Sequence, residues 1–122
     1  MHEMSIAMSI VESVEGVLAD ERDGGEAGRV AAVYVMVGAM SGVVPEALEF
    51  AWSAATGGTA VAGARLAIEA VPAAVWCEAC GAEREIAGVA LLCPTCGVAC
   101  RELVRGRELE IMSLEMTDEQ AA

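Results

Sequence analysis

Four cysteines toward the C-terminal end of the chain have a spacing that suits metal binding. They form two C-x-x-C pairs separated by twelve residues, namely Cys77 with Cys80 and Cys93 with Cys96. Two residues between the thiolates allow both sulfurs of a pair to coordinate the same ion from one side. Gly81 and Gly97 permit the turn that follows each pair. Four sulfur ligands leave no open coordination position for a substrate. The pattern therefore predicts a structural Zn(II) ion rather than a catalytic one.

Other uses of these thiols fit the pattern less well. The cysteine count of five is odd, and C-x-x-C pairs favour a metal over disulfides. A redox dithiol would need a thioredoxin-like βαβ context, which the surrounding sequence lacks. Iron can take the place of zinc in such a site. The fifth cysteine, Cys100, lies outside both pairs and is interpreted as a spare thiol, with an alternative ligand or a redox-active group as the other readings.

The segment around the cysteines is small and electrically neutral. It cannot bury enough apolar surface to fold alone, so metal binding should supply its folding free energy. From Trp76 to Arg107 the chain has four arginines and four glutamates. Zinc ribbons often serve nucleic-acid proteins, but a neutral segment without interleaved aromatics disfavours that function.

The only histidine of the chain is His2. An initiator methionine is normally retained before a bulky residue, so this imidazole should stay in second place. The α-amino group of Met1 and the backbone nitrogen and imidazole of His2 could then chelate one metal, with the next amide or the Glu3 carboxylate as a fourth donor. Such nitrogen-rich, nearly planar donors suit Ni(II) or Cu(II). From the residues alone, an unimportant terminus is the alternative, because short His-Glu pairs arise by chance.

The rest of the chain must supply a folded body that positions these residues. With 122 residues, of which 56% are hydrophobic, the chain can hold one ordinary core and a small appendage. Residues 5–19 predict a helix capped by Ser5. Its apolar face is formed by Ile6, Ile10, Val14, Val17 and Leu18. The polar stretch 20–28 is interpreted as a loop.

Two further segments predict a strand and a second helix. Residues 29–38 are rich in valine and have apolar residues at both odd and even positions, which is typical of a central strand covered on two faces. Pro45 suits the first position of a helix whose apolar face holds Leu48, Ala51, Trp52 and Ala55, and Gly57 and Gly58 should end it.

Two alternating segments complete the predicted sheet. Residues 64–71 alternate charged and apolar side chains, which predicts a strand with one solvated face, and residues 108–116 show a weaker alternation. Residues 117–122 are interpreted as a loose tail. The expected fold class is therefore α+β, with a small sheet and two helices plus a zinc-ribbon-like domain that holds its ion with four cysteines.

Charge and hydropathy exclude several classes of function. The formal net charge is -12 and all seven basic residues are arginines, so nucleic acid would be repelled by most of the surface. No uncharged run reaches the roughly twenty residues of a membrane span. The absence of a basic N-terminal region disfavours a signal peptide and predicts a cytoplasmic protein. No phosphate-binding loop is present, and we expect no enzyme activity.

Five stretches taken together resemble the HypA family of nickel metallochaperones for [NiFe]-hydrogenase maturation. They are "MHEMS" at the N-terminus, "VGAMSGVVPEALEFAW", the two "CxxCG" motifs and "GRELEIMSLEM", so that the resemblance covers residues 1 to about 116. It implies a two-domain α+β protein. A nickel domain would span 1–75 and be completed by the strand 107–116, a zinc domain would span 76–106, and 117–122 would form the tail.

The resemblance also implies the metal ligands. His2 would be the nickel imidazole ligand, Glu3 would support or join that site, and Met1 would contribute its backbone amine. The zinc ligands would be Cys77, Cys80, Cys93 and Cys96. Some family members add a carboxylate after the first long strand, but here that stretch reads "AMSGVV" without an acid, and Glu46 is a weak substitute. The resemblance carries no role onto Cys100.

The predicted function is accordingly Ni(II) binding and transfer, with structural Zn(II) and without catalysis. The implied partners are a nickel-handling maturation GTPase, the hydrogenase large subunit precursor and, for some members, urease maturation proteins, but neither nucleic acid nor a membrane. The alternative is a zinc-ribbon adaptor between proteins that has no nickel function. A hydrolase or deaminase that uses the cysteine-bound zinc is a further rival.

Overall fold

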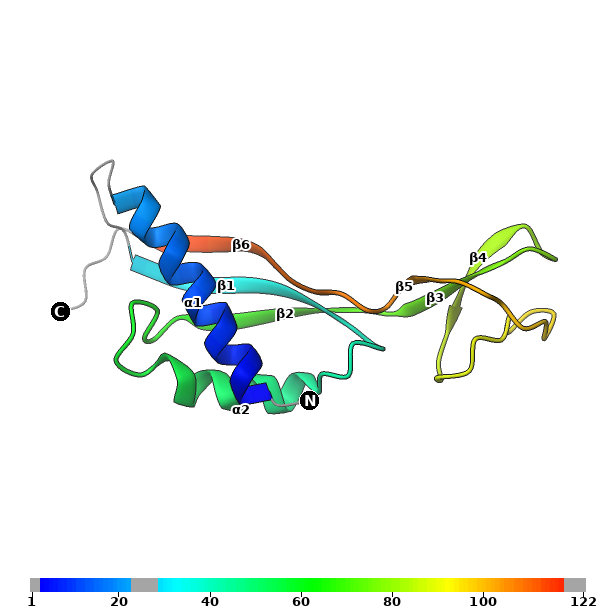
Figure 1. The fold of residues 1–122 in the computed structure, drawn as a ribbon, viewed down its shortest axis with the longest axis horizontal. Helices are drawn as coiled ribbons and strands as arrows, with labels where there is room; N and C mark the ends of the chain where they lie inside the picture. The colour runs from blue at the N-terminus through cyan, green and yellow to red at the C-terminus, as the bar shows by residue number, and fades with distance from the viewer. Residues whose placement is uncertain (1–2, 23–28, 118–122) are drawn as a thin grey trace. The chain divides into compact units, whose positions relative to one another are not determined.

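The protein has an α+β fold, as predicted from the sequence. The computed structural model describes residues 3–22 and 29–117. In chain order its elements are α1 (Glu3–Arg22), β1 (Arg29–Gly38), α2 (Pro45–Thr56), β2 (Arg65–Val71), β3 (Ala73–Cys77), β4 (Ala82–Ile86), β5 (Leu103–Arg105) and β6 (Leu109–Thr117) (Figure 1). Within these residues the strands form two three-stranded sheets, in the orders β2-β1-β6 and β4-β3-β5.

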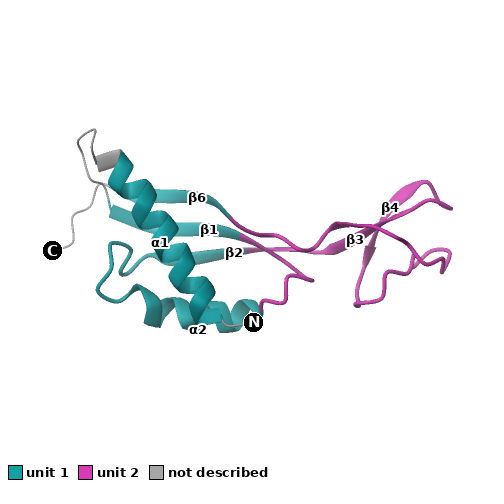
Figure 2. Cartoon of the chain, in the orientation of Figure 1, with its two compact units in different colours: residues 1–35, 44–68, 111–122 teal, residues 36–43, 69–110 magenta. Residues whose placement is uncertain are grey.

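The elements divide into two compact units, coloured separately in Figure 2. Unit 1 comprises residues 1–35, 44–68 and 111–122, and unit 2 comprises residues 36–43 and 69–110. Both helices belong to unit 1 and the sheet β4-β3-β5 belongs to unit 2. The nickel domain and zinc domain expected from the sequence, 1–75 with 107–116 and 76–106, stay predictions.

Helix α1 packs an apolar stripe into the core of unit 1. Its buried side chains are Ala7, Ile10, Val11, Val14 and Leu18. The stripe is centred nearer Ala7 than predicted, so Ile6 is half-buried and Val17 is 49% exposed at the rim. The predicted cap at Ser5 is wrong because the helix begins at Glu3. The helix also continues to Arg22, and residues 23–28 of the predicted loop lie outside the described residues.

Helix α2 begins and ends where the sequence predicts. Pro45 occupies the first turn, and Gly57 follows the last helical residue. Leu48, Ala51 and Trp52 are buried as expected, whereas Ala55 is half-buried. The indole Nε1 of Trp52 donates a hydrogen bond of 2.9 Å to the carbonyl oxygen of Ala64, which satisfies its only polar group in the core.

Strand β1 is central, as its two-sided apolar pattern predicted. It lies between β2 and β6, and Val30, Ala32, Val33, Val35 and Val37 are buried. The Tyr34 hydroxyl donates to Glu115 Oε1 at 2.6 Å and accepts from Arg65 at 3.3 Å, so polar side chains link the three strands.

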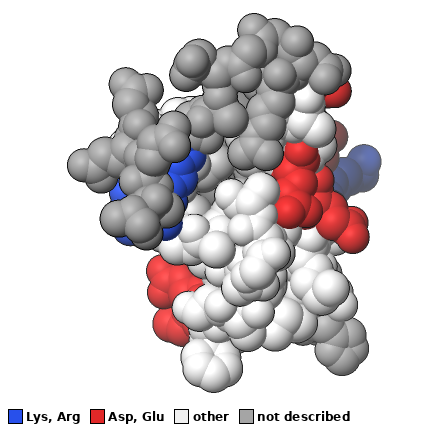
Figure 3. All heavy atoms as spheres, turned by 90° about the vertical axis from the view of Figure 1, so that its left-hand side faces the viewer, with Lys and Arg blue, Asp and Glu red and all other residues white. Residues whose placement is uncertain are grey.

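Figure 3 shows carboxylates and uncharged side chains over much of the described surface on one face of the molecule.

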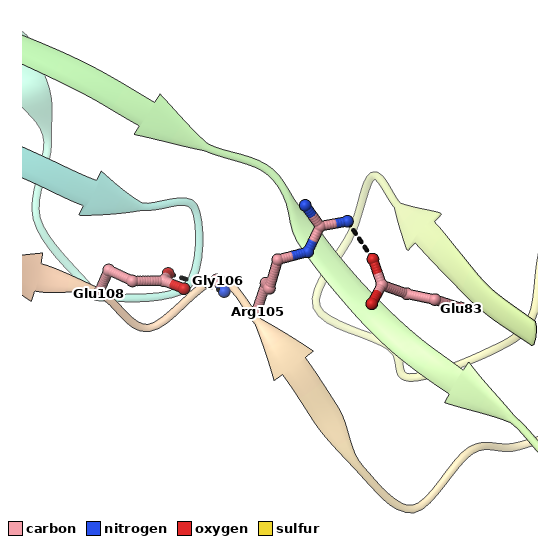
Figure 4. Close-up of polar contacts among 4 residues, drawn as sticks. All are labelled: Glu83, Arg105, Gly106 and Glu108. Carbon is pink, nitrogen blue, oxygen red and sulfur yellow. Dashed lines mark hydrogen bonds and ion pairs between the residues drawn. The ribbon is translucent and has the colours of Figure 1, made fainter.

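Most residues of unit 2 are exposed or half-buried, and β3 is the central strand of its sheet. Strand β3 pairs antiparallel with β4 on one side and with β5 on the other. Arg105 of β5 reaches across β3 and forms an ion pair with Glu83 of β4, and the Gly106 amide donates to Glu108 Oε1 at 2.9 Å (Figure 4). Both partners of the ion pair are 44% exposed, so the pair contributes little stability by itself.

Gly38 lies at a close approach of two backbones within unit 2. Its amide donates to the Glu108 carbonyl oxygen at 2.8 Å, and a Cβ added at Gly38 would overlap the carbonyl group of Gly106. Gly38→Ala is therefore expected to lower the free energy of unfolding by about 2–4 kcal/mol, because backbone must move to admit the methyl group. Urea denaturation of the zinc-loaded protein measures this change.

Gly57→Ala is the matched control, because a Cβ at Gly57 meets no atom within 4 Å and its φ of −57° suits alanine. We expect its free energy of unfolding to differ from that of the wild type by no more than about 0.5 kcal/mol. Equal stability of the two variants would show that the backbone around Gly38 gives way at no cost.

Candidate metal centre

The first cysteine pair lies in the turn that joins β3 to β4. Cys77 ends β3 and pairs with Ala82 of β4. Between them the Gly81 amide donates to the Cys77 carbonyl oxygen at 2.8 Å, and the Cys80 amide donates to Cys77 Sγ at 3.4 Å. Gly81 has a φ of 65°, a left-handed conformation that glycine adopts without strain. The predicted role of this glycine is confirmed.

The second pair repeats the same turn. Leu92 and Ala99 form an antiparallel bridge, and the Cys93 amide donates to the Val98 carbonyl oxygen at 2.9 Å. Inside this hairpin the Gly97 amide donates to the Cys93 carbonyl oxygen at 2.8 Å, and Gly97 has a φ of 77°. Each pair therefore presents its two sulfurs from one tight turn.

The two turns bring the four sulfurs together. The Sγ atoms of Cys77, Cys80, Cys93 and Cys96 all lie within 4.8 Å of one another. The distance is 3.6 Å between Cys77 Sγ and Cys96 Sγ and 3.9 Å between Cys80 Sγ and Cys93 Sγ. A tetrahedral zinc site with Zn–S bonds of about 2.3 Å places its sulfurs about 3.8 Å apart. The donor set therefore fits Zn²⁺, and none of the five cysteines forms a disulfide.

The electrostatics of the cluster favour a bound cation. The backbone amides of Cys96 and Thr95 lower the pKa of the Cys93 thiol to about 6. The Val98 amide also lowers the pKa of Cys96, but the neighbouring Cys77 sulfur and burial outweigh it and raise that pKa to about 12. Without a cation the cluster therefore resists ionisation of all its thiols, and a divalent ion removes this penalty.

Arg84 lies beside the cysteines, a position that the sequence did not reveal. It lies on β4 opposite Val75, and the Cys80 sulfur, followed by electrostatic attraction to the thiolates, raises the pKa of its guanidinium. Its Nε is buried and has no hydrogen-bond partner among the described residues. The cation thus offsets part of the negative charge of the thiolates. Only the register of β4 against β3 distinguishes Arg84 from the other arginines, so no sequence motif could have identified it.

Cys100 stands outside the group of four. Its amide donates to the Leu91 carbonyl oxygen at 2.7 Å, and its Sγ donates to the Val98 carbonyl oxygen at 3.6 Å. Together with Trp76 and Glu78 it lines a surface cavity of about 230 Å³. These contacts agree with the interpretation of Cys100 as a spare thiol that belongs to neither pair.

The predicted nickel-binding segment is described only from Glu3 onward. Met1 and His2 lie outside the described residues. Glu3 is the first residue of α1, and its Oε2 accepts a hydrogen bond of 3.3 Å from the Val44 amide, directly before α2. Among residues 3–22 and 29–117, the four cysteines are the only group of three or more metal-binding side chains. Neither helix in these ranges is long and apolar enough to span a membrane.

Comparison with known sequences gives matches along almost the whole chain. A family model described as "Hydrogenase/urease nickel incorporation, metallochaperone, hypA" matches residues 1–116. The hydrogenase maturation factor HypA of Roseiflexus sp. (strain RS-1) is 44% identical over 122 residues, covering 98% of this chain and 94% of the relative. That of Chloroflexus aurantiacus (strain ATCC 29366 / DSM 635 / J-10-fl) is 44% identical over 118 residues, covering 94% and 98%.

Solved structures share the fold. The solution structure of the Ni metallochaperone HypA from Helicobacter pylori is similar with a TM-score of 0.56 and 22% identity, covering 98% of this chain and 100% of the other. Another solution structure of HypA protein gives a TM-score of 0.61 and 21% identity, covering 91% and 95%. At these identities the likeness concerns the fold alone.

Proposed function

Because the chain belongs to the HypA family of hydrogenase/urease nickel incorporation metallochaperones, we propose that it binds Ni(II) through Met1, His2 and Glu3 and delivers it to maturing [NiFe]-hydrogenase. The observation that carries this proposal is the family match, which begins at residue 1 and so includes the whole Met-His-Glu segment. The donors would be the Met1 amine, the His2 backbone nitrogen and imidazole, and the Glu3 carboxylate, a set that suits Ni(II).

In this proposal the two metals have separate tasks. Four thiolates hold Zn(II) in a closed site, with Cys77, Cys80, Cys93 and Cys96 as ligands, and this ion stabilises unit 2. Nickel is the cargo and binds at the end of the chain, where its donors can be detached one at a time. The chain carries out no catalysis. Its partners are a nickel-handling GTPase and the hydrogenase large subunit precursor, and urease maturation is a second candidate client because the family description includes urease.

Nickel titration of the untagged, zinc-loaded protein and its His2→Ala variant tests this function. Loss of the imidazole removes one of the nitrogen donors, so the variant is expected to bind Ni(II) about a hundredfold more weakly, or about 2.7 kcal/mol. Isothermal titration calorimetry measures the affinity, and zinc content should be equal in both proteins. If wild type and variant bound nickel equally, the alternative of a zinc-ribbon adaptor without a nickel function would be favoured.

A further inference from the structure

Arg84 lies on the face of the sheet β4-β3-β5 that also carries Cys77. In the antiparallel pairing of β3 with β4, Val75 lies opposite Arg84 and Cys77 lies opposite Ala82. Directly opposed residues project to the same face of a sheet, and so do residues two positions apart along a strand. The diagonal from Arg84 to Cys77 is therefore short enough for a long side chain to span. The register of the two strands thus brings the guanidinium to the cysteine turns of unit 2.

The guanidinium lies beside one sulfur of each cysteine pair. The Cys80 sulfur has the largest effect on the pKa of Arg84 and raises it, and the Cys93 sulfur raises it further, whereas burial opposes both. Cys80 belongs to the turn between β3 and β4, and Cys93 belongs to the second hairpin. Their sulfurs are 3.9 Å apart. Because a guanidinium holds its N–H groups in a planar, divergent arrangement, a single arginine can donate to both sulfurs.

Arg84 has an unused donor and no competing carboxylate. Its Nε is buried and lacks a hydrogen-bond partner among the described residues. The acids on either side of it, Glu83 and Glu85, are exposed on the opposite face of β4, and Glu83 is paired with Arg105. Arg84 itself forms no ion pair with a carboxylate in the part of the chain that the structure describes. Because a buried donor without an acceptor is unfavourable, Arg84 needs acceptors from the cysteine cluster.

A bound zinc ion provides these acceptors. A divalent ion held by four thiolates leaves two negative charges uncompensated. The protein has a formal net charge of -12, so the rest of the chain adds to this negative charge. Thiolates that bind zinc keep lone pairs that accept hydrogen bonds, and bonds from a charged donor are stronger than those from a neutral one. Arg84 supplies both the positive charge and the donors at this place.

We propose that Arg84 is a positioning residue of the zinc site, which donates hydrogen bonds to the Cys80 and Cys93 thiolates and so joins the two cysteine turns around the ion. This inference rests on the zinc site that forms part of the proposed function, and it concerns retention of zinc rather than binding of nickel. Groups that hydrogen-bond to metal ligands typically change metal affinity by about 10–100-fold when they are removed. Arg84 should therefore be needed for tight zinc binding although it is not a ligand.

Three variants of the whole chain test this role. Arg84→Met keeps most of the apolar stem and removes the charge and every donor, and Arg84→Lys keeps the charge without the planar guanidinium. Arg101→Met is the matched control, because Arg101 is an exposed arginine of the same unit. Zinc affinity is measured by competition with a chromophoric chelator. Arg84→Met is expected to bind zinc about 10–100-fold more weakly than the wild type, Arg84→Lys to fall between the two, and Arg101→Met to equal the wild type.

Cobalt(II) in place of zinc separates hydrogen bonding to the sulfurs from packing of the arginine stem. A donor lowers the energy of the sulfur lone pairs, so its loss should shift the sulfur-to-cobalt charge-transfer band of Arg84→Met to longer wavelength. A role in packing alone would leave the band in place. An unshifted band, zinc affinity of Arg84→Met equal to that of the wild type, or equal losses in Arg84→Met and Arg101→Met would each overturn the inference.

Arg84→Lys provides a second test if Arg84→Met takes up no metal. An ammonium group cannot place its donors as a guanidinium does, so the cobalt charge-transfer band of this variant should shift in the same direction by a smaller amount. A band identical to that of the wild type would overturn the inference and leave the proposed function standing. Absence of zinc binding by the wild type would instead defeat the proposed zinc site itself.

Discussion

Replacing Cys93 with alanine is expected to abolish zinc binding and to unfold the metal-binding part of unit 2. Between residues 73 and 105, all of which the structure describes, the buried side chains are Ala73, Ala74, Val75, Cys77 and Cys93. So few apolar groups cannot offset the entropy of ordering this segment. Zinc binding supplies about 10–16 kcal/mol in small zinc domains. Loss of one of the four sulfurs therefore removes most of the free energy that folds the segment.

Zinc content and tryptic cleavage together measure this outcome. The chain contains arginine but no lysine, so trypsin cleaves only after its seven arginines. Arg84 and Arg101 lie within the segment that should unfold. In Cys93→Ala, zinc should be lost and cleavage after these two residues should accelerate by at least about tenfold, because local unfolding exposes the backbone to the protease.

Cys100→Ala is the matched control. It makes the same chemical change in the same hairpin, but Cys100 stands outside the group of four sulfurs. This variant should keep its zinc and its resistance to trypsin. Retention of zinc by Cys93→Ala would refute the four-sulfur site, and loss of zinc from Cys100→Ala would show that the fifth thiol takes part in binding.

The parts of the fold that could be predicted from the sequence are those with local signals. The bounds of α2 follow from Pro45 and Gly57, which begin and end a helix through their backbone conformations. The central position of β1 follows from apolar residues at both odd and even positions along the strand. The convergence of the cysteines follows from their spacing and from Gly81 and Gly97, because each turn is closed by residues four positions apart or fewer.

Features that depend on pairing between distant residues could not be predicted. Strand β4, "AEREI", has no buried residue, and its sequence shows no alternation of apolar and polar residues that would predict a strand. It is held in place by its antiparallel pairing with β3. The position of Arg84 beside the sulfurs depends on the register of that pairing. The contact between Glu3 and the Val44 amide joins residues 41 positions apart through a backbone donor, which no side-chain pattern reveals.

Extra residues before Met1 are expected to abolish tight nickel binding while the zinc site stays filled. A peptide bond at Met1 converts the terminal amine, a good metal donor, into an amide, and the chelate ring that joins it to the His2 backbone nitrogen is lost. Fusing Gly-Ser-Gly-Ser to the N-terminus should therefore weaken Ni(II) binding by at least about a hundredfold, or about 2.7 kcal/mol. Calorimetry on zinc-loaded protein measures the affinity, and mass spectrometry verifies the first residue.

Two controls distinguish loss of the amine from other effects of the extension. The same four residues fused to the C-terminus should leave nickel affinity unchanged, since they leave Met1 free. A removable N-terminal extension, cleaved by a protease that leaves Met1 as the first residue, should restore binding in the same protein preparation. Tight nickel binding by the uncleaved fusion would show that the terminal amine is not a ligand, and the His2 imidazole and Glu3 carboxylate would then have to hold the ion with other donors.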